Sequence, residues 1–267
     1  GSSARCVRGL GGAGKMVAMP RFKDGAICIR HVDWSETSQV VALLTREHGK
    51  VAGVAKGAKR MSPSAVARYS GGIELLTEGE VVGIIKASAE LATLTEWSLL
   101  DPHPHLRCDL AAMHLALYAA DLCGAMLADH DPHPAAFEAM RTLLHGLAEA
   151  RGREGLLLRF QWTLLGETGY APDLDRARQR DLDRATFVFD CDKGTLHEDE
   201  SLARDDSPSG PWRVRGQTVG ALLAADRGEP DIPRDDAGRA NRLLAAYVRT
   251  LLGRELPTMR VAGVTHM

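Results

Sequence analysis

The 267-residue sequence lacks several features that mark large classes of protein. Its five cysteines are scattered, odd in number and form no CxxC pair, so we expect reduced thiols in a cytoplasmic protein. No apolar run approaches the roughly 20 residues of a membrane-spanning helix. The chain has no GxSxG motif, no HExxH motif and no Cys/His nucleophile pattern, and we therefore do not expect an enzyme.

Acidic residues are missing from one short segment. Gly49–Arg60, with the sequence GKVAGVAKGAKR, holds four cations and no acid in a chain whose net charge is −2. The first 70 residues carry twelve cations against four acids, a net charge of +8, so the rest of the chain carries −10. This asymmetry predicts a polyanionic partner for the N-terminal part.

Length and composition predict about two domains with a proper core, because 45% of the residues are hydrophobic. Residues 1–18 are basic and rich in glycine, without the apolar centre of a signal peptide, and are predicted to be a disordered tail. Gly9–Lys15 has the spacing of a phosphate-binding loop, but Met16 replaces the Ser or Thr and no apolar strand precedes it. We therefore do not expect a nucleotide site there.

Residues 19–100 have the pattern of a small β domain. Five short apolar segments separated by turn residues predict an antiparallel barrel or sandwich. The predicted strands are 25–32, 38–45, 50–56, 80–86 and 91–100. Alternation along the third strand places Lys50 and Lys56 on one face and Val51, Gly53 and Ala55 on the other.

Beyond Pro104 the spacing of apolar residues changes to that of helices. Helices are predicted over residues 104–130, 135–150, 154–168 and 237–252. The fold class is therefore α+β, with a helical domain in two parts, 101–175 and 216–254. These parts flank an insert over 176–215, which is rich in Asp, Arg, Ser and Pro and is predicted to be a hairpin. Residues 255–267 are predicted to be a C-terminal tail.

Two segments in this order resemble the RecO recombination mediators of bacteria. The first is WSETSQVVALLTREHGKVAGVAKGAKR (34–60), and the second is LLLRFQWTLLGETGYAPDLDR (156–176). The resemblance implies an OB-fold barrel followed by a helical domain with a small insert. It also implies binding of single- and double-stranded DNA, strand annealing, and loading of RecA on SSB-coated DNA together with RecR, in the cytoplasm at the nucleoid.

The resemblance further implies a groove for the acidic, apolar C-terminal tail of SSB, to which Leu157, Arg159 and Trp162 could contribute. Many members of the family also bind zinc through two CxxC pairs in the insert. Here the first pair falls on Ala177 and Arg180, and the second on His197 and Glu200. A structural zinc site needs about four N or S ligands. We therefore expect that zinc has been lost and that the chain has no metal or other cofactor.

The candidate DNA-binding residues are basic side chains in two regions. They are Arg30, Arg46, Lys50, Lys56, Lys59 and Arg60 in the β domain, and Arg239 and Arg242 on the last long helix. Lys56, Lys59 and Arg60 are the preferred candidates, because Gly57 and Ala58 leave their loop open to a phosphate backbone. For the helix arginines, a solvated face paired with local acids is the favoured alternative.

The β domain is poor in aromatic residues, which supply base stacking in many OB grooves. Trp34 and Tyr69 could stack on a base, but each is better explained as a core or turn residue. We therefore expect binding to depend mainly on phosphates. If about five cations engage a single strand, log K should fall against log salt with a slope of roughly −3 to −4.

Three alternatives remain open. One is an RNA-binding OB module, and another is a pure interaction scaffold. The third is a metal-dependent hydrolase built on the sequences DPHPH (101–105) and DHDPHP (129–134), whose metal-capable residues are His103, His105, His130, Asp131 and His133. Both sequences directly precede helical patterns, so we interpret them as helix starts.

Overall fold

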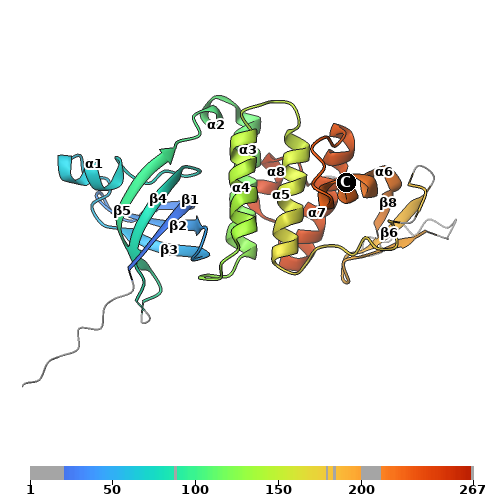
Figure 1. The fold of residues 1–267 in the computed structure, drawn as a ribbon, viewed down its shortest axis with the longest axis horizontal. Coiled ribbons are helices and arrows are strands. Elements are labelled where there is room, and N and C mark those ends of the chain that lie inside the picture. Colours follow the sequence, from blue (N-terminus) through green and yellow to red (C-terminus); the bar gives the residue numbers. More distant parts are fainter. Residues whose placement is uncertain (1–20, 87–88, 179, 183–184, 200–211, 266–267) are drawn as a thin grey trace, which may run out of the picture.

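The computed structural model consists of a β domain, a layer of helices and a small second sheet, arranged in that order along the long axis (Figure 1). It describes residues 21–86, 89–178, 180–182, 185–199 and 212–265. The predicted tail 1–18 lies outside the described residues. The chain is a mixed α+β protein with an N-terminal sheet, as predicted.

All five predicted strands of the β domain are present. They are β1 (Arg21–Asp33), β2 (Gln39–Thr45), β3 (Lys50–Ala55), β4 (Glu78–Ile84) and β5 (Ala92–Asp101). They close into a barrel in the order β1-β2-β3-β5-β4, with β3 and β5 parallel. Val51, Gly53 and Ala55 are buried while Lys50 is only partly buried and Lys56 is exposed, which confirms the predicted alternation.

A helix that the sequence analysis missed lies between β3 and β4. This helix, α1 (Pro63–Tyr69), begins after Ser62, whose hydroxyl accepts the Ala65 amide, and has proline in its first turn. Tyr69 is buried in the barrel core, and its hydroxyl donates to the Leu94 carbonyl at 2.9 Å. Seven residues are too few to show a helical period, so only the Ser-Pro start signal was available.

Seven further helices follow the barrel in the described part of the chain. They are α2 (His105–Cys108), α3 (Leu110–Met126), α4 (Pro134–Gly146), α5 (Arg153–Glu167), α6 (Gly216–Asp226), α7 (Arg234–Leu252) and α8 (Pro257–Val261). The predicted helix 104–130 is in fact two helices, because Asp109 is extended and its carboxylate accepts the Ala112 amide to start α3. Among the described helices, none has both the length and the apolar character needed to cross a membrane.

The insert is a three-stranded sheet rather than a two-stranded hairpin. Its strands are β6 (Thr186–Asp190), β7 (Thr195–Glu198) and β8 (Trp212–Arg215), in the order β7-β6-β8. Phe187 and Phe189 are buried in the same core as the helices, and the Phe189 ring meets Tyr247 of α7 edge-on at 5.2 Å. Apolar packing therefore attaches this sheet to the helical domain.

The segment expected as a C-terminal tail, 255–267, contains a packed helix. Leu256 and Met259 are buried against the helical core, and Thr258 donates a hydrogen bond to Asp121 of α3 at 2.7 Å. The five residues of α8 are too few to show a helical period.

The turn between β2 and β3 helps to dock the barrel on the helical domain, beside the packing of β1 on α3. The Lys50 carbonyl accepts the His130 amide at 3.0 Å, and the Lys50 ammonium donates to the Gly124 carbonyl at 2.9 Å and pairs with Asp129 at 3.3 Å. Arg46 pairs with Glu138 of α4 at 2.5 Å. We call this contact the docking turn.

Gly49 sits at the centre of the docking turn. Its φ is +69°, and a β-carbon built there would lie 2.2 Å from the backbone oxygen of Asp131. Any side chain at this position would therefore both strain the turn and push the barrel away from the helices.

We predict that Gly49→Ala destabilises the protein more than Gly71→Ala. Gly71 has a φ of +89° but no atom within 4 Å of a built β-carbon, so its variant carries only the left-handed backbone cost of roughly 1–2 kcal/mol. Gly49→Ala carries the same backbone cost, and its clash with the Asp131 backbone should lower the free energy of unfolding by about a further 1–3 kcal/mol. Urea unfolding of both variants measures the difference, and equal losses would contradict the docking described here.

Candidate nucleic-acid interface

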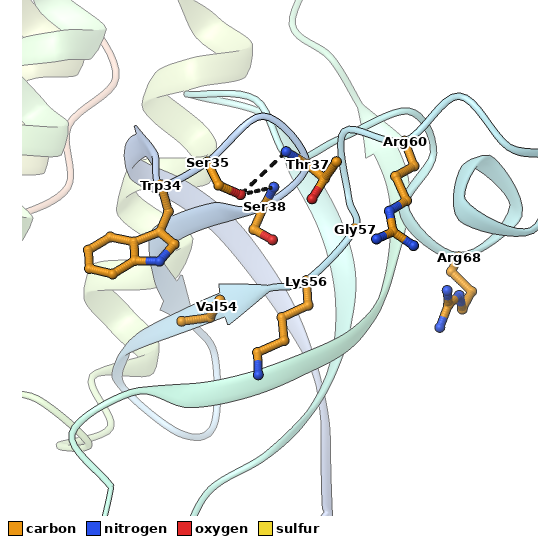
Figure 2. Close-up of a pocket in the computed structure, with 9 residues that line it drawn as sticks. All are labelled: Trp34, Ser35, Thr37, Ser38, Val54, Lys56, Gly57, Arg60 and Arg68. Atoms are coloured by element: carbon orange, nitrogen blue, oxygen red, sulfur yellow. Dashed lines mark hydrogen bonds between the residues drawn. The ribbon is translucent and has the colours of Figure 1, made fainter.

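An open pocket of about 390 Å³ lies at the edge of the barrel, and we call it the rim pocket. Three parts of the chain line it: the loop after β1, the end of β3 with its following loop, and α1 (Figure 2). The lining residues are Trp34, Ser35, Thr37, Ser38, Val54, Lys56, Gly57, Arg60 and Arg68.

The loop after β1 is held in a tight turn. The Ser35 hydroxyl accepts the Ser38 amide at 3.1 Å, and the Trp34 amide donates to the Ser38 carbonyl at 3.1 Å. This turn leaves the Trp34 side chain 72% exposed. Trp34 is thus a turn residue, as expected, but its ring is open to solvent.

The loop after β3 is tied to the first loop by its backbone. The Lys59 amide donates to the Thr37 carbonyl at 3.2 Å, and the Arg60 amide donates to the Gly57 carbonyl at 3.1 Å. Gly57 has a φ of +77°, which favours glycine and lets the chain turn back at the end of β3. The two loops therefore place Lys56, Arg60 and Trp34 around the same open pocket, with Trp34 and Arg60 on opposite sides (Figure 2).

Three cations of the rim pocket are exposed, and none forms an ion pair with an acid of the described residues. They are Lys56, Arg60 and Arg68. Arg68 is held by its own helix, donating to the Ser64 carbonyl and lying 5.8 Å from the centre of the Tyr69 ring. The sequence analysis did not select Arg68, because it did not find α1 and so could not orient this residue.

Lys59 lies beside the rim pocket but is paired. Its ammonium donates to Asp33 at 2.8 Å, and His31 contacts the other oxygen of the same carboxylate at 3.0 Å. These hydrogen bonds, the one from Lys59 first, hold the pKa of Asp33 below its usual value. A partner that engaged Lys59 would have to compete with this carboxylate.

The other barrel cations lie away from the rim pocket. Arg46 and Lys50 belong to the docking turn, and the Lys50 side chain is only 16% exposed. Arg30 is exposed and lines a different cavity, of about 540 Å³, between the barrel and α3, where Asp121 and Asp129 also lie.

Arg239 and Arg242 belong to a separate basic site where α7 meets α6 and β8, on the side of the helical domain away from the barrel (Figure 1). They line an open groove of about 350 Å³, which we call the arginine groove. Its other lining residues are Arg213, Val214, Arg215, Thr218 and Leu243. Arg239 pairs with Asp236 on its own helix, which agrees with the alternative that this face is paired with local acids. Arg242 forms no ion pair with a described residue.

The positions of the family's zinc ligands do not fit a metal. Ala177 is buried in the apolar core, and Arg180 pairs with Glu198 at 2.9 Å. His197 contacts Arg176 at 2.9 Å, and Glu200 lies outside the described residues. The positions of the first pair therefore offer no ligand atom for zinc.

The two His-Pro sequences do not form one site. His133 immediately precedes α4, whereas the His103 ring lies 5.1 Å from the ring of His145 in the last turn of that helix. At 1.5 Å per residue, the twelve residues from His133 to His145 separate the two sequences by about 18 Å. A hydrolase centre that combined both is not supported by this arrangement.

Two profiles of one known protein family match nearly the whole described chain. The profile described as Recombination protein O N terminal matches residues 19–103, and the profile described as Recombination protein O C terminal matches residues 107–260. The protein named DNA repair protein RecO from Anaeromyxobacter sp. (strain K) is 30% identical over 254 residues, which are 91% of this chain and 96% of that protein.

Two other proteins of the same name are similar. The one from Myxococcus xanthus (strain DK1622) is 28% identical over 251 residues, which are 90% of this chain and 96% of that protein. The one from Salinibacter ruber (strain DSM 13855 / M31) is 35% identical over 207 residues, which are 77% of this chain and 76% of that protein.

We predict that Lys59→Gln raises the pKa of Asp33. The carboxylate loses its strongest partner, so it should accept a proton at a higher pH than in the unchanged protein. The ¹³C shift of the Asp33 carboxyl group followed against pH measures this change. Lys56→Gln serves as the control and should leave the titration unchanged, and an unaltered Asp33 pKa in Lys59→Gln would show that the ion pair does not form in solution.

Proposed function

Because the chain belongs to the RecO family of DNA repair proteins, we propose that its rim pocket binds the sugar–phosphate backbone of single- and double-stranded DNA. One observation carries the proposal: Lys56, Arg60 and Arg68 surround one open pocket without pairing to a described acid. These cations can bind phosphates without first breaking an ion pair. Arg46 and Lys50 would have to leave the docking turn to do so.

The topology of the barrel supports the same site. The closed order β1-β2-β3-β5-β4, with α1 between β3 and β4, is that of an OB fold, which we propose for residues 19–100. OB folds bind oligonucleotides on the face of strands 2 and 3 and through the loop between strands 1 and 2. The rim pocket is built from that loop and from the end of β3.

The chemistry of the rim pocket suits strand annealing. Phosphate contacts and one stacking residue hold a strand without reading its base edges, which stay free to pair with a complementary strand. In this proposal the protein is a mediator without catalytic activity. It holds strands in the cytoplasm at the nucleoid and acts with RecR in loading RecA on SSB-coated DNA.

The arginine groove is our proposed site for the acidic C-terminal tail of SSB. Arg215 and Arg242 offer charge for carboxylates, and Val214 and Leu243 offer an apolar floor. The residues expected from the sequence have other partners: Leu157 is buried, the half-buried Arg159 donates to the Glu229 and Pro230 carbonyls, and the half-buried Trp162 donates to Asp226. The distance between the two basic sites would let SSB and DNA bind together.

We predict that replacing Lys56, Arg60 and Arg68 together with alanine weakens binding to single-stranded DNA and flattens its salt dependence. Each phosphate contact contributes about −0.7 to the slope of log K against log salt, so these three cations account for a slope of about −2, most of which the variant should lose. Fluorescence anisotropy with a labelled oligonucleotide across a salt series measures both quantities.

A charge-matched control for this experiment is the triple alanine variant of Arg21, Lys23 and Arg249. All three are exposed, and Arg21 and Lys23 already pair with Glu96 and Glu80. This variant loses the same charge and should keep most of the slope. If both variants flatten the slope equally, net charge rather than the rim pocket drives binding. An equal affinity for a matched RNA oligomer would favour the RNA-binding alternative.

We also predict that Trp34→Ala weakens binding to single-stranded DNA at every salt concentration while leaving the slope unchanged. Stacking of one base on an aromatic ring is worth about 1–3 kcal/mol and involves no phosphate. Trp34→Phe should restore part of the affinity. An unchanged affinity in Trp34→Ala would remove stacking from the proposed mechanism.

A further inference from the structure

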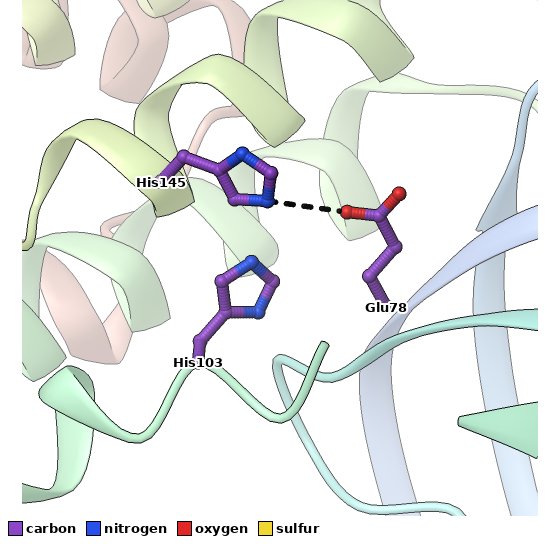
Figure 3. A group of neighbouring side chains, drawn as sticks. All are labelled: Glu78, His103 and His145. Carbon is purple, nitrogen blue, oxygen red and sulfur yellow. Dashed lines mark ion pairs between the residues drawn. The ribbon is translucent and has the colours of Figure 1, made fainter. Parts of the chain in front are cut away.

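A cluster of potential metal ligands lies where the barrel meets the helical domain (Figure 3). Glu78 begins β4, His103 follows β5, and His145 is in the last turn of α4. One ligand atom of each residue lies within 4.8 Å of the other two. The three residues are far apart in sequence, so only the fold brings them together.

Two of these ligand atoms are buried without a hydrogen bond. They are Oε2 of Glu78 and Nε2 of His103. The two residues are 8% and 1% exposed. Leaving a buried polar atom unsatisfied costs free energy, so buried polar atoms without a partner are rare in native proteins. Both atoms face the same small space between the domains.

The His103 ring is oriented as a ligand would be. Its Nδ1 lies 2.8 Å from the Leu76 carbonyl, which can only accept, so Nδ1 carries the proton and Nε2 presents a lone pair. Histidine ligands of metals commonly donate their other ring N–H to a carbonyl in this way. Burial lowers the pKa of His103, which favours the same neutral ring.

Glu78 and Asp101 each use one carboxylate oxygen in a hydrogen bond. Oε1 of Glu78 accepts from Arg141 at 2.8 Å, and Oδ1 of Asp101 accepts the His103 amide at 2.7 Å. The remaining oxygens face the imidazoles: Nε2 of His145 is 3.4 Å from Oε2 of Glu78 and 3.5 Å from Oδ2 of Asp101. Nε2 of His103 is 3.8 Å from the same Asp101 oxygen.

These atoms are all electron-pair donors when His145 is neutral, and they repel one another unless a cation lies among them. A tetrahedral zinc site with bonds of about 2.0–2.1 Å has ligand–ligand edges of about 3.3–3.4 Å. The 3.4 Å between Nε2 of His145 and Oε2 of Glu78 is close to such an edge, and the ligand atoms of the three residues all lie within 4.8 Å of one another, so the site would contract on binding. Two imidazoles with one carboxylate form a donor set that suits zinc and similar divalent transition metals.

We propose that Glu78, His103 and His145 bind one divalent transition metal ion of the zinc class. The ion joins the barrel, through Glu78, to α4 of the helical domain, through His145. From the sequence no metal is expected, and His103 is interpreted there as part of a helix start.

The rival explanation is a proton. A protonated His145 could bridge the Glu78 and Asp101 carboxylates without any metal, and it would leave His103 Nε2 unsatisfied. The two explanations differ in what the protein takes up from solution, so they can be separated without any measurement of DNA binding.

The test is calorimetric titration of the chelator-treated full chain with Zn²⁺, and separately with Co²⁺. We expect one ion per chain, a rise in Tm on binding, and the visible d–d absorption of tetrahedral Co²⁺. His145→Ala should weaken this binding by more than the roughly 10–100-fold that loss of an outer hydrogen-bond partner costs. His145 has a side chain 42% exposed, so its replacement should not prevent folding.

Two further variants complete the experiment. Asp101→Asn removes a neighbouring charge but no ligand and should weaken binding less than His145→Ala. His114→Ala, which removes a partly exposed imidazole of α3, should leave binding unchanged. The proposal is overturned if neither Zn²⁺ nor Co²⁺ binds. It is also overturned if binding survives His145→Ala, because an adventitious ion elsewhere would then explain the uptake.

Discussion

The docking turn is the contact on which the rest of the arrangement depends. Gly49 lets the chain between β2 and β3 come against the backbone of Asp131, and Lys50 then bonds to Gly124, Asp129 and the His130 amide. A basic residue in this position is buried by the helical domain, so it is unavailable to a partner. The docking turn therefore decides which cations of the basic segment can act.

The basic segment divides into two parts with different roles. Lys50 lies at the docked end of β3, while Lys56 follows the other end, about 20 Å away at roughly 3.3 Å per residue. Alternation puts both lysines on the outer face of the barrel, but only the second end opens onto Trp34, Arg60 and Arg68. One end of the strand thus holds the domains together and the other presents charge to nucleic acid.

The sequence predicts what depends on local pattern and misses what depends on distant partners. The strands and long helices follow from their periods, whereas α1 and α8 are too short to show one. Arg46 pairs with Glu138, which lies more than 90 residues later in the chain, and no local sequence pattern predicts this ion pair. The contact between the rings of His103 and His145 could not be predicted from the sequence for the same reason.

Hydrogen exchange of the full chain with and without a single-stranded oligonucleotide tests the central claim most directly. The account predicts that DNA slows exchange at residues 34–38 and 56–60, around the rim pocket, while the docking turn at 46–50 keeps its exchange rate. The account is contradicted if protection appears at the docking turn or along the arginine groove and the rim pocket stays unchanged.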